Sequence, residues 1–181
     1  MPTLPILDKG PAEIVWGYGE SAAVYLGKTI GAVKLTMETQ TSDINEDQEG
    51  VAAVNAILTG SIVEVEVPLT RLSVEQLATA INSEVVGDNI VPIRNQIGCD
   101  MYSLSKQLVI KPLCGNEISD DPATWVHIYH AYPVAGLDLT WDLDTQRIIP
   151  VKFKVFVSQE SGWEGDFGTI GMESGSTEYG I

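Results

Sequence analysis

Two histidines, His127 and His130, are the side chains best suited to acid–base or metal chemistry in this sequence. They lie three positions apart in a segment whose residue types favour a strand. On a regular strand, side chains three positions apart point to opposite faces of the sheet, so the two imidazoles cannot hold one metal ion. No Gly-x-Ser-x-Gly motif accompanies them. We therefore expect no catalytic residue, no metal site and no enzymatic activity.

An acidic run begins like a calcium-binding loop. Asp43, Asn45 and Asp47 have the spacing of the first three ligands of such a loop. The loop also needs Gly at its sixth position for the turn and Glu at its twelfth for bidentate ligation. Gln48 and Val54 occupy these two positions, which favours a solvated acidic segment over a calcium site.

Two further patterns are too incomplete to indicate a cofactor. Gly17 and Gly19 are spaced as in a dinucleotide fingerprint, but that motif must open a helix, whereas residues 22–26 favour a strand. Cys99 and Cys114 lie fifteen positions apart in the sequence, without the further ligands that a zinc site requires. We expect no cofactor, and we expect both cysteines to be reduced and partly buried.

The charge balance restricts the range of partners. The chain has 25 acidic and 10 basic residues, a formal net charge of −15. A phosphate backbone repels such a chain, which argues against sequence-specific nucleic-acid binding. An acidic surface past which nucleic acid slides remains compatible with this balance, and simple solubility is the alternative explanation.

No targeting or membrane segment is recognisable in the sequence. Residues 1–10 do not have the basic and apolar regions of a secretion signal, and no apolar run approaches about eighteen residues. The expectation is a protein made in the cytoplasm that does not contact a membrane.

Alternation of apolar and polar residues predicts most of the elements. The expected strands are residues 22–26, 32–39, 61–67, 107–113, 125–132, 137–143 and 151–157, with a weaker one at 14–16. Ser73 and Gln76 form a capping box that begins a helix ending near Asn82. Many strands with one short helix predict a mainly-β sandwich or barrel.

The last two expected strands suggest a hairpin. Pairing Leu137 with Phe153 and Leu139 with Val151 brings both apolar faces to the same side. A slip of one residue would bury the lysines that alternate with these apolar residues, so this register is the predicted one.

Two segments are expected to be loops. Residues 40–60 are longer than most connections between strands, and residues 50–58 within them are compatible with a helical turn. Residues 161–181 contain six glycines and little periodicity, which predicts a mobile C-terminal tail. The predicted organisation is one β-rich domain over residues 1–160 followed by this tail.

The order of several short motifs resembles that of phage tail tube proteins. Residues 27–77 contain G-K-T-I-G-A-V-K-L, T-S-D-I-N-E-D-Q-E-G, I-L-T-G-S-I-V-E-V-E-V-P-L and S-V-E-Q-L, and D-P-A-T-W-V-H-I-Y-H-A-Y-P follows later. Together these stretches and the hairpin after them cover about three quarters of the chain. Each motif is weak alone, and their order carries the resemblance. The glycine-rich tail departs from the pattern and would fit a terminal or neck component, or an arm between subunits.

The resemblance implies a structural virion protein located in the phage tail. Its subunit would be a β-sandwich or barrel with one flanking helix, and the inner strands of hexameric rings would close a barrel. Stacked rings would form the conduit for DNA ejection, with DNA passing through the lumen without specific binding. The implied partners are other copies of the chain, a sheath or terminator protein, and the baseplate.

The resemblance also assigns a role to the long segment at residues 40–60, which would contact the neighbouring ring. We expect it to be poorly ordered in the free subunit, because its apolar second half gains nothing from exposure to water. The alternative is that these apolar residues cover the core of their own subunit. The expected assembly residues are Asp43, Glu46, Asp47, Glu49, Val51, Val54, Ile57 and Leu58.

Other functions remain open on the sequence alone. A different phage neck, head-completion or baseplate protein and a secretion-system tube protein are related alternatives. A monomeric β-sandwich that binds a ligand such as a carbohydrate belongs to a different class, and it should expose an aromatic cluster. The candidates for that cluster are Trp125, Trp141 and Trp163.

Overall fold

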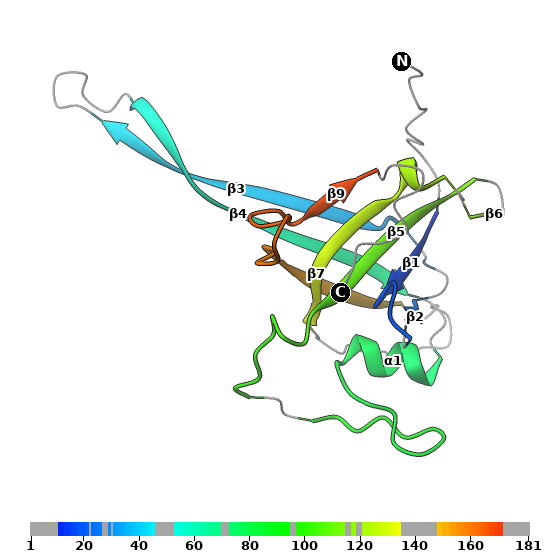
Figure 1. Ribbon diagram of the computed structural model, residues 1–181. Helices are drawn as coiled ribbons and strands as arrows, with labels where there is room; N and C mark the ends of the chain where they lie inside the picture. Colours follow the sequence, from blue (N-terminus) through cyan, green and yellow to red (C-terminus); the bar gives the residue numbers. More distant parts are fainter. Residues whose placement is uncertain are drawn as a thin grey trace.

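The computed structural model describes residues 11–21, 23–26, 29, 31–45, 53–69, 73–94, 97–114, 117–118, 121–134 and 148–171. In these residues it shows an antiparallel sheet with one α-helix (Figure 1), so the predicted mainly-β class is confirmed. In chain order the elements are β1 (Ala12–Trp16), β2 (Val24–Tyr25), β3 (Lys34–Asn45), β4 (Ala53–Leu69), α1 (Val74–Ala80), β5 (Lys106–Cys114), β6 (Glu117–Ile118), the 3-10 helix η1 (Pro122–Thr124), β7 (Val126–Val134), β8 (Ile149–Phe156) and β9 (Gly168–Ile170).

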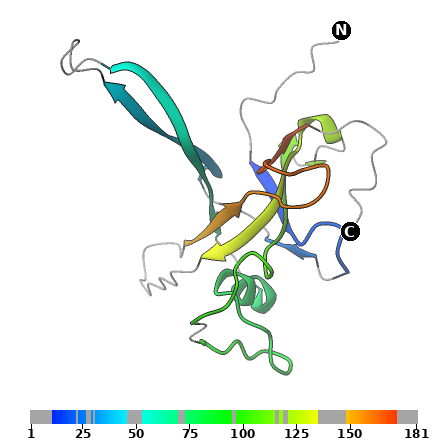
Figure 2. The same cartoon turned by 60° about the vertical axis from the view of Figure 1, so that its left-hand side comes forward.

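The sheet is open and strongly curved. Its strands follow the order β2-β1-β5-β7-β8-β4-β3, with β6 beside β5 and β9 beside β7. Ile14 and Trp16 of β1 share one hydrophobic cluster with Val65 of β4, although three strands lie between β1 and β4 in the sheet order. The sheet therefore bends around a single core, as the two views in Figures 1 and 2 show.

Alternation explains which strands line this core. In β8 the inward residues Val151, Phe153 and Val155 are buried, whereas Lys152 and Lys154 are exposed. Burying each large apolar side chain contributes about 1.5–3 kcal/mol. A shift of one residue would exchange these two sets, so the burial of the core fixes the register of β8.

Opposite charges on the outer face support the same register. Glu66 of β4 lies between Lys34 of β3 and Lys152 of β8, and Glu64 lies opposite Lys154. Directly opposed charges on neighbouring strands stabilise a sheet by a few tenths of a kcal/mol to about 1 kcal/mol. The lysines of this face are thus matched by acidic neighbours of the same chain.

The predicted capping box is confirmed at the start of α1. The Gln76 backbone amide donates to Ser73 Oγ at 3.2 Å, and the Ser73 amide donates to Gln76 Oε1 at 2.8 Å. The Gln76 side-chain amide also donates to the Tyr25 carbonyl at 2.7 Å, which fastens the helix to β2. Ala80 joins the hydrophobic core, so α1 covers one end of the curved sheet.

The predicted loop at residues 40–60 is wrong for most of its length. β3 continues to Asn45 and β4 begins at Ala53, so strands occupy all but residues 46–52 of the connection, and those lie outside the described residues. The possible helical turn at 50–58 is likewise excluded from residue 53 onward. Beyond the last pair between β4 and β8, Glu64–Lys154, the hairpin projects from the body as a two-stranded arm, residues 37–45 and 53–63 (Figure 1).

The predicted hairpin register of β8 is also wrong. Phe153 pairs with Val65 on one side and with Pro133 on the other, so neither edge is open for Leu137 at this position. The strand that immediately precedes β8 in the sheet is β7, and residues 135–147, including the predicted strand 137–143, lie outside the described residues. β4, which is distant in sequence, pairs with the edge of β8 that a hairpin between neighbouring segments would leave free.

Much of the predicted C-terminal tail folds back onto the sheet. β9 pairs with β7, the Tyr129 amide donates to the Phe167 carbonyl at 3.1 Å, and the Ser158 amide donates to the backbone carbonyl of Asp166 at 2.8 Å. Residues 161–171 are therefore part of the domain, whereas residues 172–181 lie outside the described part of the chain.

This return of the chain depends on Gly168. A Cβ at this position would lie 2.1 Å from the carbonyl oxygen of His127 and 2.9 Å from the Cα of Ile128, so the Gly168→Ala protein cannot keep β9 paired as it is. We expect it to lose about 2–3 kcal/mol of unfolding free energy in urea denaturation. The Gly60→Ala protein is the control, because a Cβ there meets nothing within 4 Å. Equal stability of the two variants would contradict the close approach of β9 to β7.

Candidate functional site

The structure places the expected assembly residues along the arm. Asp43 is exposed on β3, and Ile57 and Leu58 are exposed on β4. Val54 also belongs to β4, whereas Glu46, Asp47, Glu49 and Val51 lie outside the described residues. The described members thus belong to a regular strand pair instead of a loop.

Both faces of the arm carry exposed apolar side chains. Ile57 pairs with Ser42 and Leu58 with Thr41, and neighbours along a strand point to opposite faces. Their exposed fractions are 55% and 63%, and that of Met37 is 62%. The alternative in which these side chains cover their own core is therefore wrong for Ile57 and Leu58.

The backbone of the arm also offers unpaired edges. Among the described strands, β3 pairs with β4 alone, and β4 pairs with β8 only from Glu64 onward. A two-stranded ribbon is marginally stable in water by itself. Free strand edges together with exposed apolar side chains are typical of surfaces that bind another protein.

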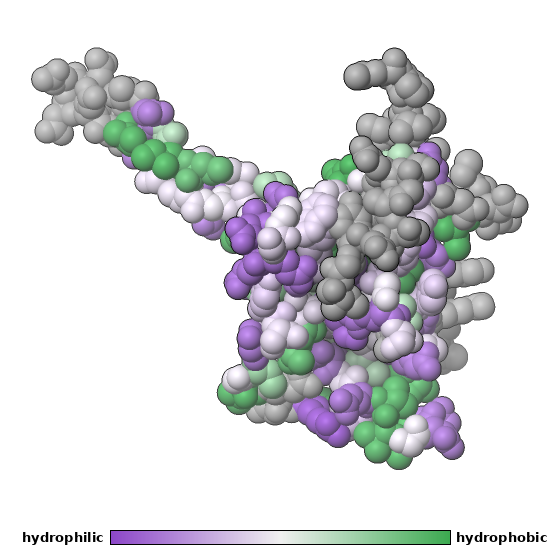
Figure 3. Space-filling view, in the orientation of Figure 1, coloured by the Kyte–Doolittle hydropathy of each residue, from purple (hydrophilic) through white to green (hydrophobic). Residues whose placement is uncertain are grey.

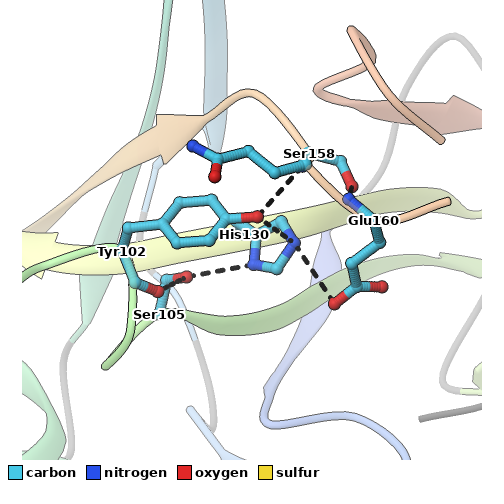
Figure 4. A network of polar contacts seen from close by, with 6 residues as sticks. Tyr102, Ser105, His130, Ser158 and Glu160 are labelled. Atoms are coloured by element: carbon cyan, nitrogen blue, oxygen red, sulfur yellow. Dashed lines mark hydrogen bonds and ion pairs between the residues drawn. The ribbon is translucent and has the colours of Figure 1, made fainter.

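A second cluster surrounds His130 on β7 (Figure 4). The Ser105 hydroxyl donates to the Tyr102 carbonyl at 2.6 Å, so Ser105 Oγ can accept a hydrogen bond from His130 Nδ1–H at 3.1 Å. The Tyr102 hydroxyl accepts from the Gln159 amide at 3.0 Å and lies 3.3 Å from His130 Nε2, to which it can donate. These bonds suit a neutral imidazole that carries its proton on Nδ1.

This cluster has the residue types of a hydrolytic triad but not the arrangement. Glu160 Oε1 lies 3.7 Å from His130 Nε2, and the Glu160 side chain is 61% exposed. A nucleophilic serine must give its proton to the imidazole. The proton of Ser105 instead goes to a backbone carbonyl, so the geometry describes a structural tie between residues 102–105, β7 and residues 159–160.

The prediction that the two histidines face opposite sides is wrong. The register between β5 and β7 shifts between Lys106–Ala131 and Leu108–Ile128, which inserts one extra residue into β7. Ile128 and Ala131 both belong to the core, so the strand changes phase between them and His127 and His130 share the outer face. They nevertheless have separate neighbours. Within the described residues, no three His, Cys, Asp or Glu side chains come together in a way that could hold a metal ion.

His127 lies in an aromatic cluster. The Tyr18 ring contacts the His127 and Trp125 rings edge-on, with centroids 5.5 Å and 6.1 Å apart. The Lys111 ammonium lies over the Trp125 ring at 4.1 Å. Burial, with a smaller contribution from the positive charge of Lys111, lowers the pKa of His127 to about 4.

The tryptophans do not form an exposed binding cluster in the described part of the chain. Trp125 is buried beneath Lys111 and Tyr18. Trp163 is half-buried and packs on Tyr129 with ring centroids 4.9 Å apart, and Trp141 lies outside the described residues. This arrangement does not favour the ligand-binding module.

Sequence reasoning missed a second apolar surface, which follows α1. Six exposed apolar side chains lie in residues 83–94 and 97–104, here called the basal segment. Figure 3 shows apolar side chains both on the arm and along the lower end of the molecule. The six residues are Val86, Ile90, Ile93, Ile97, Met101 and Leu104. The signal in the sequence is an isoleucine-rich stretch without helical or strand periodicity.

Comparison with known proteins adds no assignment. No protein-family model matches this sequence, and no curated protein matches it significantly. Within the described residues, no helix has both the length and the apolar composition required to cross a membrane.

The buried neutral His127 predicts acid sensitivity. The unfolded chain binds a proton at this imidazole near pH 6.5, whereas the folded chain does so only near pH 4, so stability falls as pH decreases between these values. From pH 7.5 to pH 5 we expect a loss of about 2 kcal/mol from this group. The His127→Gln protein should lose correspondingly less over the same range in urea denaturation. Equal pH dependence of the wild type and His127→Gln would contradict this.

Proposed function

We propose that this chain is a structural virion protein, a tail tube subunit that forms stacked hexameric rings and a conduit for DNA ejection. The observation that supports this most strongly is the arm, which projects from the core with apolar side chains on both faces. The most exposed of these are Met37, Ile57 and Leu58. Water opposes such exposure, whereas burial between subunits would turn the same side chains into a source of binding energy.

The open sheet supports assembly into a ring. The outer edge of β3 is unpaired in the described chain, and β2 ends the sheet on the other side. Exposed strand edges invite uncontrolled pairing, and closure of a ring removes them. In the proposed ring, the strands of neighbouring subunits continue one another and the inner strands close a barrel.

The charge distribution suits a conduit. The net charge is −15. In the described part of the chain five lysines lie beside acidic or aromatic residues, and three of these are the outer-face lysines opposite Glu64 and Glu66. Lys106 forms an ion pair with Glu20 at 2.6 Å, and Lys111 lies over Trp125. Few cations therefore remain to neutralise phosphates, so DNA would pass through the lumen without being held.

The proposed location is the tail of the virion, after synthesis in the host cytoplasm. Its partners there are other copies of the chain, a sheath or terminator protein, and the baseplate. A neck, head-completion or baseplate protein would use the same kind of arm and is the closest alternative. The Ser105 hydroxyl donates its hydrogen bond to a backbone carbonyl, which does not favour a hydrolase. Trp125 is buried, which does not favour a module that binds ligands through exposed aromatic rings.

The proposal is tested by removing apolar side chains from the arm. The Ile57→Ser, Leu58→Ser protein should keep its fold by circular dichroism, since both residues are exposed. Each apolar side chain that is no longer buried between subunits costs about 1.5–3 kcal/mol of association free energy per contact. The concentration needed for polymerisation should therefore rise at least about a hundredfold. Sedimentation velocity and negative-stain microscopy measure this.

The matched control is the Ile148→Ser, Val157→Ser protein, whose substituted residues have exposed fractions of 45% and 40% but lie outside the arm. It should polymerise like the wild type. Normal tubes from the arm variant would show that the arm is not the contact. A wild-type protein that stays monomeric at high concentration would instead contradict the assembly function and favour a monomeric binding module.

A further inference from the structure

The pairing of β3 with β4 contains an extra residue in the free part of the arm. Gln40 lies opposite Gly60, and the next residue, Thr41, lies opposite Leu58, so Thr59 has no opposite residue on β3. An unmatched residue of this kind is a β-bulge, which bends the strand that carries it and increases the local twist. The bulge therefore divides the arm into a proximal part, which continues the sheet of the body, and a distal part beyond the bend.

The distal part has no third strand beside it in the described chain. β4 pairs with β8 only from Glu64 onward, and β3 pairs with β4 alone. The two strands twist about each other as the arm leaves the body (Figures 1 and 2). Because no neighbouring strand holds the distal part, its direction relative to the proximal part is set at the bulge.

The extra residue also decides which apolar side chains share a face. Met37 and Thr41 of β3 point to the same side, because an even number of positions separates them. Their partners Val63 and Leu58 therefore share that side, although they lie five positions apart along β4. In a regular strand an odd separation would place these two on opposite faces. The bulge thus lets the exposed Leu58 continue the face on which Val63 is buried.

The same residue aligns the isoleucines of the other face. Ile57 lies opposite Ser42 and Ile62 lies opposite Glu38, so both share the side of Ile44. All three isoleucines are exposed. Each face of the arm therefore carries a row of apolar side chains that crosses the bulge, and the bend at the bulge positions the distal half of both rows.

We propose that the bulge at Thr59 sets the direction in which the arm meets a neighbouring copy, and that assembly requires this direction as well as the apolar side chains. This inference rests on the proposed assembly function and assigns a positioning role to a residue whose own side chain is exposed. The core of a stable interface is packed as densely as a protein interior. A distal row that points elsewhere therefore loses its contacts even when all of its side chains are present.

Deletion of Thr59 tests the direction separately from the side chains. The pair of Gln40 with Gly60 and the pair of Thr41 with Leu58 then become adjacent, so the pairing is regular and both rows keep their residues. Circular dichroism and urea denaturation should show a fold as stable as that of the wild type. Loss of even one apolar contact per arm should raise the concentration needed for polymerisation at least about tenfold. The Thr59→Ala control keeps the extra residue and should polymerise like the wild type.

The direction itself is measured in the free subunit by the distance between two spin labels. Both native cysteines are first replaced by serine, since Cys99 is exposed, contrary to the expectation of burial. One label is placed at Ile44→Cys in the distal part, and the second at Tyr25→Cys or Ile170→Cys in the body, all at exposed positions. Ile44 lies about 14 Å along the strand beyond the bulge, so deletion of Thr59 should change at least one of the two distances by at least about 4 Å. Thr59→Ala should change neither distance.

A second variant removes the bulge from the other strand, in case the deletion impairs folding. One threonine inserted between Gln40 and Thr41 gives Thr59 an opposite residue, so the pairing again becomes regular. This variant also places Leu58 on the face opposite Val63, so it should polymerise no better than the deletion variant.

The outcomes separate the two proposals. Normal polymerisation of either bulge-free variant, or label distances that stay unchanged in both, would overturn the role of the bulge while the assembly function still stands. A wild-type protein that never associates would overturn the assembly function and the requirement for a direction. The label distances would then still decide whether Thr59 turns the arm.

Discussion

The continuity of β4 between the core and the arm is the constraint on which the rest of the structure depends. At its C-terminal end, Val65 and Val67 are buried and the strand pairs with both β3 and β8. At its N-terminal end it pairs with β3 alone and exposes Ile57 and Leu58. The buried end supplies the stability that a free two-stranded ribbon does not have. The core therefore holds the arm in a fixed direction.

The opposite end of the molecule depends in the same way on β7. This strand pairs with β5 on one side and with β8 and β9 on the other, so it joins both halves of the curved sheet. Its extra residue turns His130 outward, where the imidazole reaches Tyr102 and Ser105. The irregularity that removes His130 from the core thus creates the tie that positions the basal segment.

The sequence predicted the features that depend on nearby residues, and it failed where distant residues decide. The capping box of Ser73 and the alternation of β8 are local, and both are confirmed. The acidic run around Asp43 does not have the alternation of a strand, yet it forms one because it pairs with β4 in the folded hairpin. Among the exposed apolar side chains, the sequence singled out Ile57 and Leu58 but not those of the basal segment, because its isoleucines have no periodicity. Gly168 was assigned to a mobile tail, since its close approach to His127 is a tertiary contact.

Hydrogen exchange in the free subunit and in assembled tubes tests most directly whether the arm is a preformed strand pair that assembly buries. In the free subunit, peptides from residues 37–45 and 53–63 should be partly protected from exchange, because β3 and β4 are already paired. In tubes, exchange in these peptides should slow at least about tenfold, while that of β8, already paired on both sides, should not change. Equal exchange of the arm peptides in both states would contradict burial of the arm on assembly.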